Sequence, residues 1–160
     1  WRLLVVGGPI PAGPWPTSFV FAGRVPDVAP YLKRASVCVA PIFSGSGTRL
    51  KILEYLAAGR PVVATPKAAE GLAVEHGRHL LLADGTAFAE ALVRLARDRG
   101  YAEALAQAGR ELVATRYSWD ASRQRWRQLL ARWLEPGGSA AGKSPRAAEL
   151  ARRACRSAEG

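Results

Sequence analysis

Short runs of Val, Leu and Ala recur along this chain, and each is followed by a loop rich in Gly or Pro and then by a segment with helical periodicity. That alternation is typical of a parallel sheet whose strands are joined by helices. The runs are continuously apolar, as expected for strands that are buried on both faces. We therefore predict an α/β fold with helices on both faces of a parallel sheet.

The pattern also gives approximate bounds for the elements. The predicted strands are Leu3–Val6, Phe19–Phe21, Val37–Ala40, Val62–Ala64 and Leu80–Leu82. The predicted helices are Val28–Arg34, Arg49–Ala58, Ala87–Arg97, Ala102–Thr115 and Ala121–Leu134, in which apolar residues recur at spacings of three and four.

The length and the linker signals limit the chain to one domain with a tail. A chain of 160 residues can bury one sizeable core. After Leu134 the composition changes to a Gly-, Ala- and Arg-rich stretch that reads as a flexible linker. We predict a domain over 1–135 and a tail over 136–160 that is disordered or forms a short helix. Because the sequence opens on an apolar strand and has no Met, we expect a fragment of a larger protein.

The net charge of +10 favours anionic partners such as a phosphorylated ligand, an acidic membrane surface or nucleic acid. No nucleic-acid-binding motif occurs, so we do not expect nucleic acid, and a solvated basic surface is the plain alternative. No apolar run reaches the ~20 residues of a membrane span, and no secretory signal is present. We expect a cytoplasmic protein, with peripheral contact to the inner face of the membrane as an option.

The loop between two predicted strands is the strongest candidate for a binding site. In open parallel sheets, ligands lie outside the carboxyl ends of the strands, where Pro41–Thr48 is expected. Gly45 and Gly47 allow close backbone approach, and Thr48 is a good N-cap. Arg49 and Lys51 place positive charge on the first helical turn, which is unfavourable to the helix dipole unless an anion binds there.

Other readings of this loop remain open from its spacing alone. A glycine-rich turn before an amphipathic helix, with Lys51 paired to Glu54 on the surface, explains the same residues without a ligand. Neither the nucleoside triphosphatase motif G-x-x-x-x-G-K-[ST] nor a G-x-G-x-x-G dinucleotide motif occurs. We expect His76 and His79 to lie at the surface or in a turn.

Several ordered segments together resemble the C-terminal, donor-binding domain of family 4 glycosyltransferases of the GT-B fold. They are Leu3–Pro9, Val20–Val25, Tyr31–Leu32, Ala35–Val37, the glycine loop with Lys51–Glu54, Ala58–Thr65, Glu70–Leu72 and Tyr117–Trp119. The resemblance covers about Trp1 to Leu134 and implies a Rossmann-like domain that binds a nucleotide sugar, with UDP the expected nucleotide.

The resemblance also implies roles for individual residues. Glu54 would accept hydrogen bonds from the ribose hydroxyls, since a carboxylate can accept from two vicinal hydroxyls at once. The donor-binding residues expected from the family are Gly23, Arg24 and Val25 near the base, Gly45, Ser46, Gly47, Thr48, Arg49 and Lys51 near the diphosphate and sugar, and Glu54 and Glu70. Ser46 stands where the family usually has a second glutamate, and a serine hydroxyl can donate and accept one hydrogen bond.

For the whole enzyme, the resemblance implies retaining transfer of a sugar to a glycan or lipid-linked acceptor. The acceptor domain and the upstream cationic residues would precede Trp1, so this fragment is expected to be inactive alone. No metal or other cofactor is expected, and Arg49 is the one catalytic candidate in this chain. The alternatives are a nucleotide-sugar epimerase of the GT-B fold and a non-catalytic basic docking module.

Overall fold

The structure is a computed structural model that describes residues 1–45 and 49–134. The described chain divides between two compact units, the first spanning Trp1–Ala121 and the second beginning at Ser122. Ser46, Gly47 and Thr48 and the predicted tail over 136–160 lie outside the described residues.

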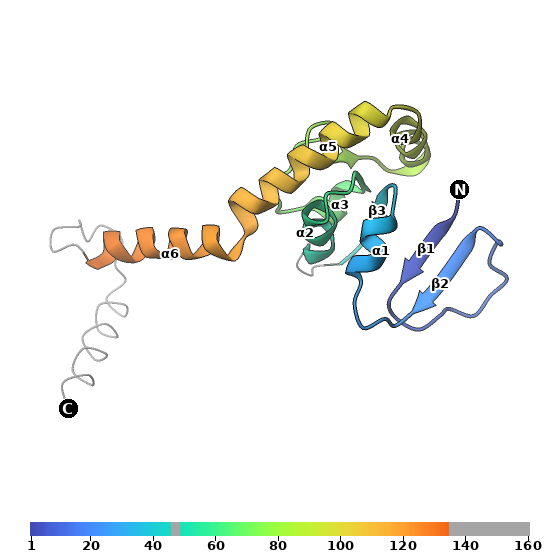
Figure 1. The fold of residues 1–160 in the computed structure, drawn as a ribbon, viewed down its shortest axis with the longest axis horizontal. Helices are drawn as coiled ribbons and strands as arrows, with labels where there is room; N and C mark the ends of the chain where they lie inside the picture. Colours follow the sequence, from blue (N-terminus) through green and yellow to red (C-terminus); the bar gives the residue numbers. More distant parts are fainter. Residues whose placement is uncertain (46–48, 135–160) are drawn as a thin grey trace. The chain divides into compact units, whose positions relative to one another are not determined.

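The strands of the first unit form two parallel sheets (Figure 1). One sheet pairs β1 (Leu3–Val6) with β2 (Phe19–Gly23). The other has the order β3-β4-β5, formed by Cys38–Ala40, Val62–Ala64 and Leu81–Leu82. The α/β class and the parallel strands are confirmed, whereas the sequence pattern predicted a single sheet.

Helices connect the strands and follow them. Their bounds are α1 Ala29–Arg34, α2 Leu50–Ala57, α3 Pro66–Ala69, α4 Gly85–Arg97, α5 Arg99–Leu112, a π-helical turn over Val113–Tyr117, and α6 Trp119–Leu134. The predicted helices are present within a few residues at their ends, and α3 was not predicted. No helix among the described residues is long and apolar enough to cross a membrane.

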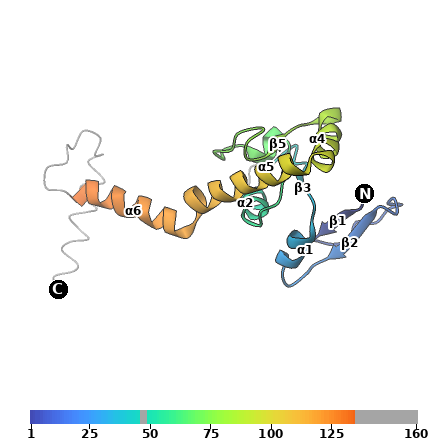
Figure 2. The same cartoon turned by 45° about the horizontal axis from the view of Figure 1, so that its top comes forward.

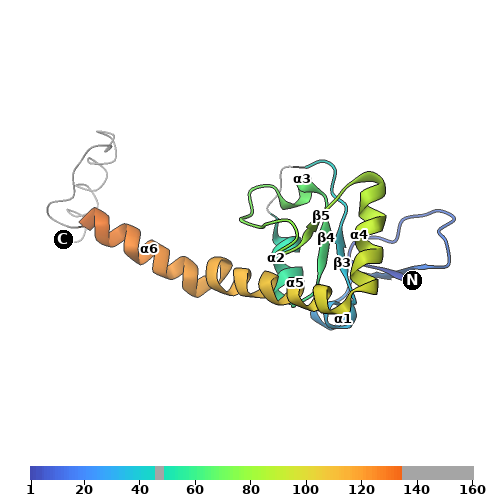
Figure 3. The ribbon, with the colours of Figure 1, turned by 90° about the horizontal axis from the view of Figure 1, so that it is seen from above.

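Strand β4 is buried on both of its faces, because helices cover both sides of the three-stranded sheet. On one face, Val62 and Ala64 pack in a core that includes Ile52 and Leu56 of α2. On the other, Val63 packs in a core with residues of α4 and α5. Figure 3 shows α2 on one side of the strands and α4 on the other. Full burial of a side chain such as Ile52 stabilises the fold by about 1.5–3 kcal/mol.

Helices α2 and α5 approach each other closely (Figure 2). A Cβ atom at Gly109 of α5 would lie 2.6 Å from Leu56 Cδ2 and 2.9 Å from the His79 carbonyl oxygen. Only a glycine fits this contact without displacing its neighbours, so Gly109 sets the spacing between α5 and the layer beneath it.

The sheet formed by β1 and β2 has an aromatic cluster in place of a deep core. The ring centroid of Trp15 lies 5.6 Å from that of Phe19 and 5.4 Å from that of Phe21. Leu4 and Val20, in contrast, are exposed. Trp15 belongs to the segment that connects β1 to β2, so these aromatic contacts pack that segment against β2.

Helix α6 carries large apolar side chains that are exposed in the structure. Trp126 is 65% exposed, and Leu130 and Trp133 are also exposed. Apolar surface that is contiguous and exposed is typical of a region that another molecule or domain covers.

Candidate functional site

The loops that follow β3 and β4 begin side by side at one end of the three-stranded sheet. The two strands are parallel neighbours, with Ala40 opposite Ala64. The Thr65 amide donates to the Ala40 carbonyl over 3.2 Å, and the Thr65 hydroxyl donates to the Ile42 carbonyl. Thr65 is only 2% exposed. This buried threonine therefore ties the two loops together at the carboxyl ends of their strands, where a ligand of a parallel sheet is expected.

An ion-pair cluster joins the same two loops a few residues further on. One oxygen of the Glu70 carboxylate, Oε2, accepts from Arg49 Nη2 over 3.0 Å and from Lys67 Nζ over 2.6 Å. Arg49 Nη2 also lies 3.5 Å from the Gly45 carbonyl oxygen, to which it donates. Arg49 and Glu70 are 21 residues apart in the sequence. The predicted residues Gly45, Arg49 and Glu70 are thus brought together.

The cluster places an ionised carboxylate between two cations. The hydrogen bond from Lys67 and the charge of Lys67 hold the pKa of Glu70 below its usual value, and Arg49 acts in the same direction. The Arg49 side chain is 10% exposed, whereas those of Lys67 and Glu70 are 41% and 59% exposed. The guanidinium is therefore the inner member of the cluster.

Helix α2 begins at Leu50, and Arg49 is its N-cap residue. We expected a side-chain cap from Thr48, but the N-cap position falls one residue later and has no side-chain cap hydrogen bond. The Ile52 amide donates to the Arg49 carbonyl over 3.1 Å. The Leu53 amide donates to the same carbonyl, and the positive end of the α2 dipole lies directly after the loop, where an anion would be favoured.

Lys51 and Glu54 both lie on exposed positions of α2. In the described part of the chain no ion pair joins them to each other. The interpretation of these residues as a surface ion pair is therefore wrong for this structure. Glu54 presents a carboxylate that can accept hydrogen bonds from a ligand.

The predicted base-binding segment lies in the other sheet. Gly23 ends β2 with a φ of +64°, a conformation that favours glycine, and its carbonyl accepts from the Gly7 amide over 2.7 Å. Arg24 is exposed and Val25 is half-buried. The segment therefore lies at the carboxyl end of β2, in a different sheet from the strands that position the Arg49 cluster.

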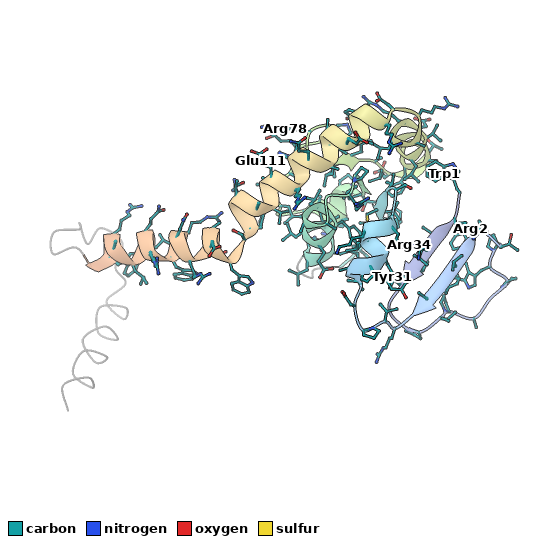
Figure 4. The ribbon with its side chains drawn as sticks, viewed as in Figure 1. Trp1, Arg2, Tyr31, Arg34, Arg78 and Glu111 are labelled. Atoms are coloured by element: carbon teal, nitrogen blue, oxygen red, sulfur yellow. The ribbon has the colours of Figure 1, made fainter. Side chains whose placement is uncertain are left out.

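The two histidines support a loop outside the cluster. His79 lies in a turn, which is one of the two expected placements, and it is buried, 6% exposed, with its Nδ1 accepting from the Glu75 amide over 3.0 Å. The His76 Nδ1 accepts from the Leu82 amide. Arg78, whose side chain lies at the surface in Figure 4, pairs with Glu75 over 3.3 Å. Both imidazoles thus hold backbone groups of this loop.

Two residues at this end of the sheet were not identified from the sequence. Thr65 belongs to the segment Ala58–Thr65, but nothing in its spacing indicated the bond to Ile42. Lys67 stands three residues before Glu70, a spacing that allows an ion pair on a helical turn and could have drawn attention to it. The described residues contain no group of three or more His, Cys, Asp or Glu that could hold a metal ion.

Comparison with known proteins gives the chain a family and a fold. A profile of the family described as "Glycosyl transferases group 1" matches residues 1–98. A phosphatidyl-myo-inositol mannosyltransferase from Mycobacterium leprae (strain TN) is 38% identical over 104 residues, which are 62% of this chain and 28% of that protein. The chain therefore spans less than a third of the length of this relative.

Solved structures of glycosyltransferases have a similar fold. Sucrose-phosphate synthase from Thermosynechococcus elongatus is 31% identical with a TM-score of 0.59, over 71% of this chain and 31% of that one. Anabaena Alr3699/HepE, solved in complex with UDP and glucose, is 19% identical with a TM-score of 0.61, over 72% of this chain and 32% of that one. The fold is GT-B-like, and the matched parts are fractions of longer chains.

Proposed function

Since this chain belongs to the group 1 glycosyltransferases, we propose that it supplies the donor-binding half of an enzyme that transfers a sugar from a nucleoside diphosphate sugar. The observation that carries the proposal is the cationic cluster at the carboxyl ends of β3 and β4. There Arg49, the N-cap residue of α2, and Lys67 both pair with Glu70. These cations and the α2 N-terminus are suited to a diphosphate.

In this proposal, the loop from Gly45 to Arg49 contacts the diphosphate and the donor sugar. Gly45 has a φ of +125° and a Cβ there would meet nothing within 4 Å, so the backbone stands open to a ligand on this side. Lys51 adds a second positive charge on the first turn of α2. Ser46, Gly47 and Thr48 belong to the same proposed loop and lie outside the described residues.

The nucleoside is held by other residues. Glu54, one turn further along α2, accepts from the ribose hydroxyls, and Gly23, Arg24 and Val25 meet the base. Because Gly23–Val25 follows β2 of one sheet and the Arg49 cluster follows β3 and β4 of the other, the nucleotide itself would bridge the two sheets. We propose UDP as the nucleotide, which is the one named in the complex of the Anabaena protein.

The chemistry proposed for the site is stabilisation of the leaving group. When the bond from the anomeric carbon to the diphosphate oxygen breaks, negative charge grows on the diphosphate. Arg49 and the α2 N-terminus would stabilise that charge, and no metal is required in this scheme. The acceptor oxygen bonds to the anomeric carbon on the face that the diphosphate leaves, so the configuration is retained, and the acceptor proton passes to the departing diphosphate oxygen. Positioning of donor and acceptor supplies the remaining acceleration.

We propose a glycan or lipid-linked acceptor, bound by a part of the enzyme outside this chain. The name of the Mycobacterium leprae relative describes transfer of mannose to phosphatidyl-myo-inositol, which supports a lipid-linked acceptor. The net charge of +10 would favour peripheral contact with an anionic membrane surface. Sedimentation with vesicles of anionic and of neutral lipid tests this part, because equal binding to both would exclude charge-driven attachment.

Titration calorimetry with UDP, GDP and ADP tests the proposal for this chain. We expect UDP to bind, ADP to bind much more weakly, and Arg49→Ala to reduce UDP binding. If neither UDP nor GDP binds to the folded protein, donor binding by this chain is excluded.

A further inference from the structure

We propose that Glu70 is a positioning residue of the donor site: its carboxylate, anchored by Lys67, fixes the Arg49 guanidinium at the mouth of the loop after β3. The sequence placed Glu70 among the residues that contact the donor. The geometry assigns it a different task, because it acts on the ligand through Arg49. This inference rests on the proposed donor site.

The carboxylate connects two loops that are otherwise distant in the sequence. Its Oε2 atom is 3.0 Å from Arg49 Nη2 and 2.6 Å from Lys67 Nζ, so one oxygen accepts from both cations. The same Arg49 nitrogen donates to the Gly45 carbonyl at 3.5 Å. The bond to Glu70 gives the guanidinium a charged anchor besides the weaker bond to Gly45, and so restricts the rotamers of this long side chain.

Glu70 stands on a rigid base. It follows directly after α3, whose residues Ala68 and Ala69 are buried. The Thr65 hydroxyl caps this helix by accepting from the Ala68 amide over 3.3 Å, and it also donates to Ile42 in the neighbouring loop. A positioning residue needs such support, since a site that is loose by about an ångström loses much of its function.

The charge balance of the cluster is compatible with an anionic ligand. Arg49 is the inner member, 10% exposed, while the carboxylate lies towards the solvent. With Glu70 ionised, the three side chains carry two positive charges and one negative charge, so the cluster keeps a net positive charge of one. An uncompensated carboxylate in contact with a diphosphate would repel it, whereas this carboxylate is paired with two cations and aligns Arg49.

A double-mutant cycle on UDP binding separates positioning from direct contact. We expect Glu70→Gln to weaken UDP binding by about two- to fivefold, the range of an exposed charged pair. We expect Glu70→Asp, which keeps the charge, to recover part of that loss. In an Arg49→Lys background, which lacks the forked guanidinium, Glu70→Gln should change UDP binding by less than about twofold.

The control is Glu75→Gln, because Glu75 is also exposed and pairs with an arginine at three-residue spacing outside the cluster. This change should leave UDP binding unaltered. The Nε–Hε resonance of Arg49 in ¹⁵N NMR gives an independent signature that requires no ligand. We expect it to shift in Glu70→Gln and to remain in place in Glu75→Gln, with both variants folded.

The outcomes distinguish this inference from the proposed function. If the wild-type protein binds neither UDP nor GDP, the donor site itself is wrong. If the wild type binds UDP but Glu70→Gln has no effect on binding or on the Arg49 resonance, the positioning role is wrong and the donor site stands. A loss of equal size in the wild-type and Arg49→Lys backgrounds would overturn it as well, since that result indicates direct contact.

Discussion

At the scale of single residues, the account depends on polar side chains at the ends of two strands. Arg49 and Glu70 were each identified from the sequence, but their pairing was not, because 21 residues separate them and only the fold brings them together. The residues of one helical turn, such as Lys67 and Glu70, could have been paired by spacing alone. Thr65 could not, since its partner Ile42 lies in a different loop.

Glu54→Gln tests the proposed contact with the ribose. A carboxylate that accepts from two hydroxyls makes charge-assisted hydrogen bonds, so its loss should weaken UDP binding by about 10- to 100-fold. Binding should be compared by calorimetry with that of Glu103→Gln, a change at an exposed glutamate of α5. Equal affinities for both variants would remove Glu54 from the site.

Cys38 should resist alkylation in the folded protein. Its side chain is buried in β3, and burial raises the pKa of its thiol to about 11. The reactive thiolate is therefore rare at pH 8. In a Cys155→Ser background, iodoacetamide should label position 38 only after denaturant is added. Rapid labelling of the native protein would show that β3 is not packed as described.

At the scale of elements, the continuous apolar runs and the long periodic segments were the most predictable from sequence. Strands β1 and β4 have the predicted bounds, since each is a continuous apolar run between loops. Helix α3 was missed because four residues are too few for a periodic pattern, although Thr65 as N-cap and Pro66 at the first position are start signals. Helix ends shifted by a few residues because capping and tertiary contacts set them.

Gly109→Ala should destabilise the protein through the contact between α5 and α2. The added Cβ would lie 2.6 Å from Leu56 Cδ2 and 2.9 Å from a backbone oxygen, which cannot move as easily as a side chain. Overpacking of this kind costs about 1–3 kcal/mol, and denaturant unfolding measures it.

Gly100→Ala is the matched control on the same helix, where the nearest atom to the new Cβ is at 3.8 Å. This change should be neutral or stabilise by up to about 1 kcal/mol, because alanine favours the helix. If both variants unfold at the same denaturant concentration, the close contact does not limit residue size at position 109.

At the scale of the whole molecule, the division into two sheets was the main difference from the prediction. The sequence pattern indicates which segments are strands and that they run parallel. It does not indicate which strands pair with each other. The strands of a doubly wound sheet lie in the order 3-2-1-4-5-6. The observed pairs fit this order when β2 and β1 take places 3 and 2, and β3, β4 and β5 take places 4, 5 and 6. Place 1, between β1 and β3, is then unfilled. No described strand occupies that place, so each sheet keeps an open edge there.

Hydrogen exchange should reveal this difference between the sheets. We expect the amides of Val63 and Ala64 in β4 to be protected at least about tenfold more than those of β1, because β4 has a partner on each side and buried faces. NMR exchange rates at each amide provide the measurement. Equal protection of β1 and β4 would indicate that β1 has a cover or partner that this structure does not contain.

The central claim is that the loops after β3 and β4 form a donor site, and NMR titration of the ¹⁵N-labelled protein with UDP tests it most directly. We predict shifts that saturate with UDP and are concentrated at Gly45–Glu54, at Thr65–Glu70 and at Gly23–Val25. A titration without saturable shifts would contradict the account. Shifts confined to the arginine-rich helix α6 would also contradict it, and would favour a basic docking module instead.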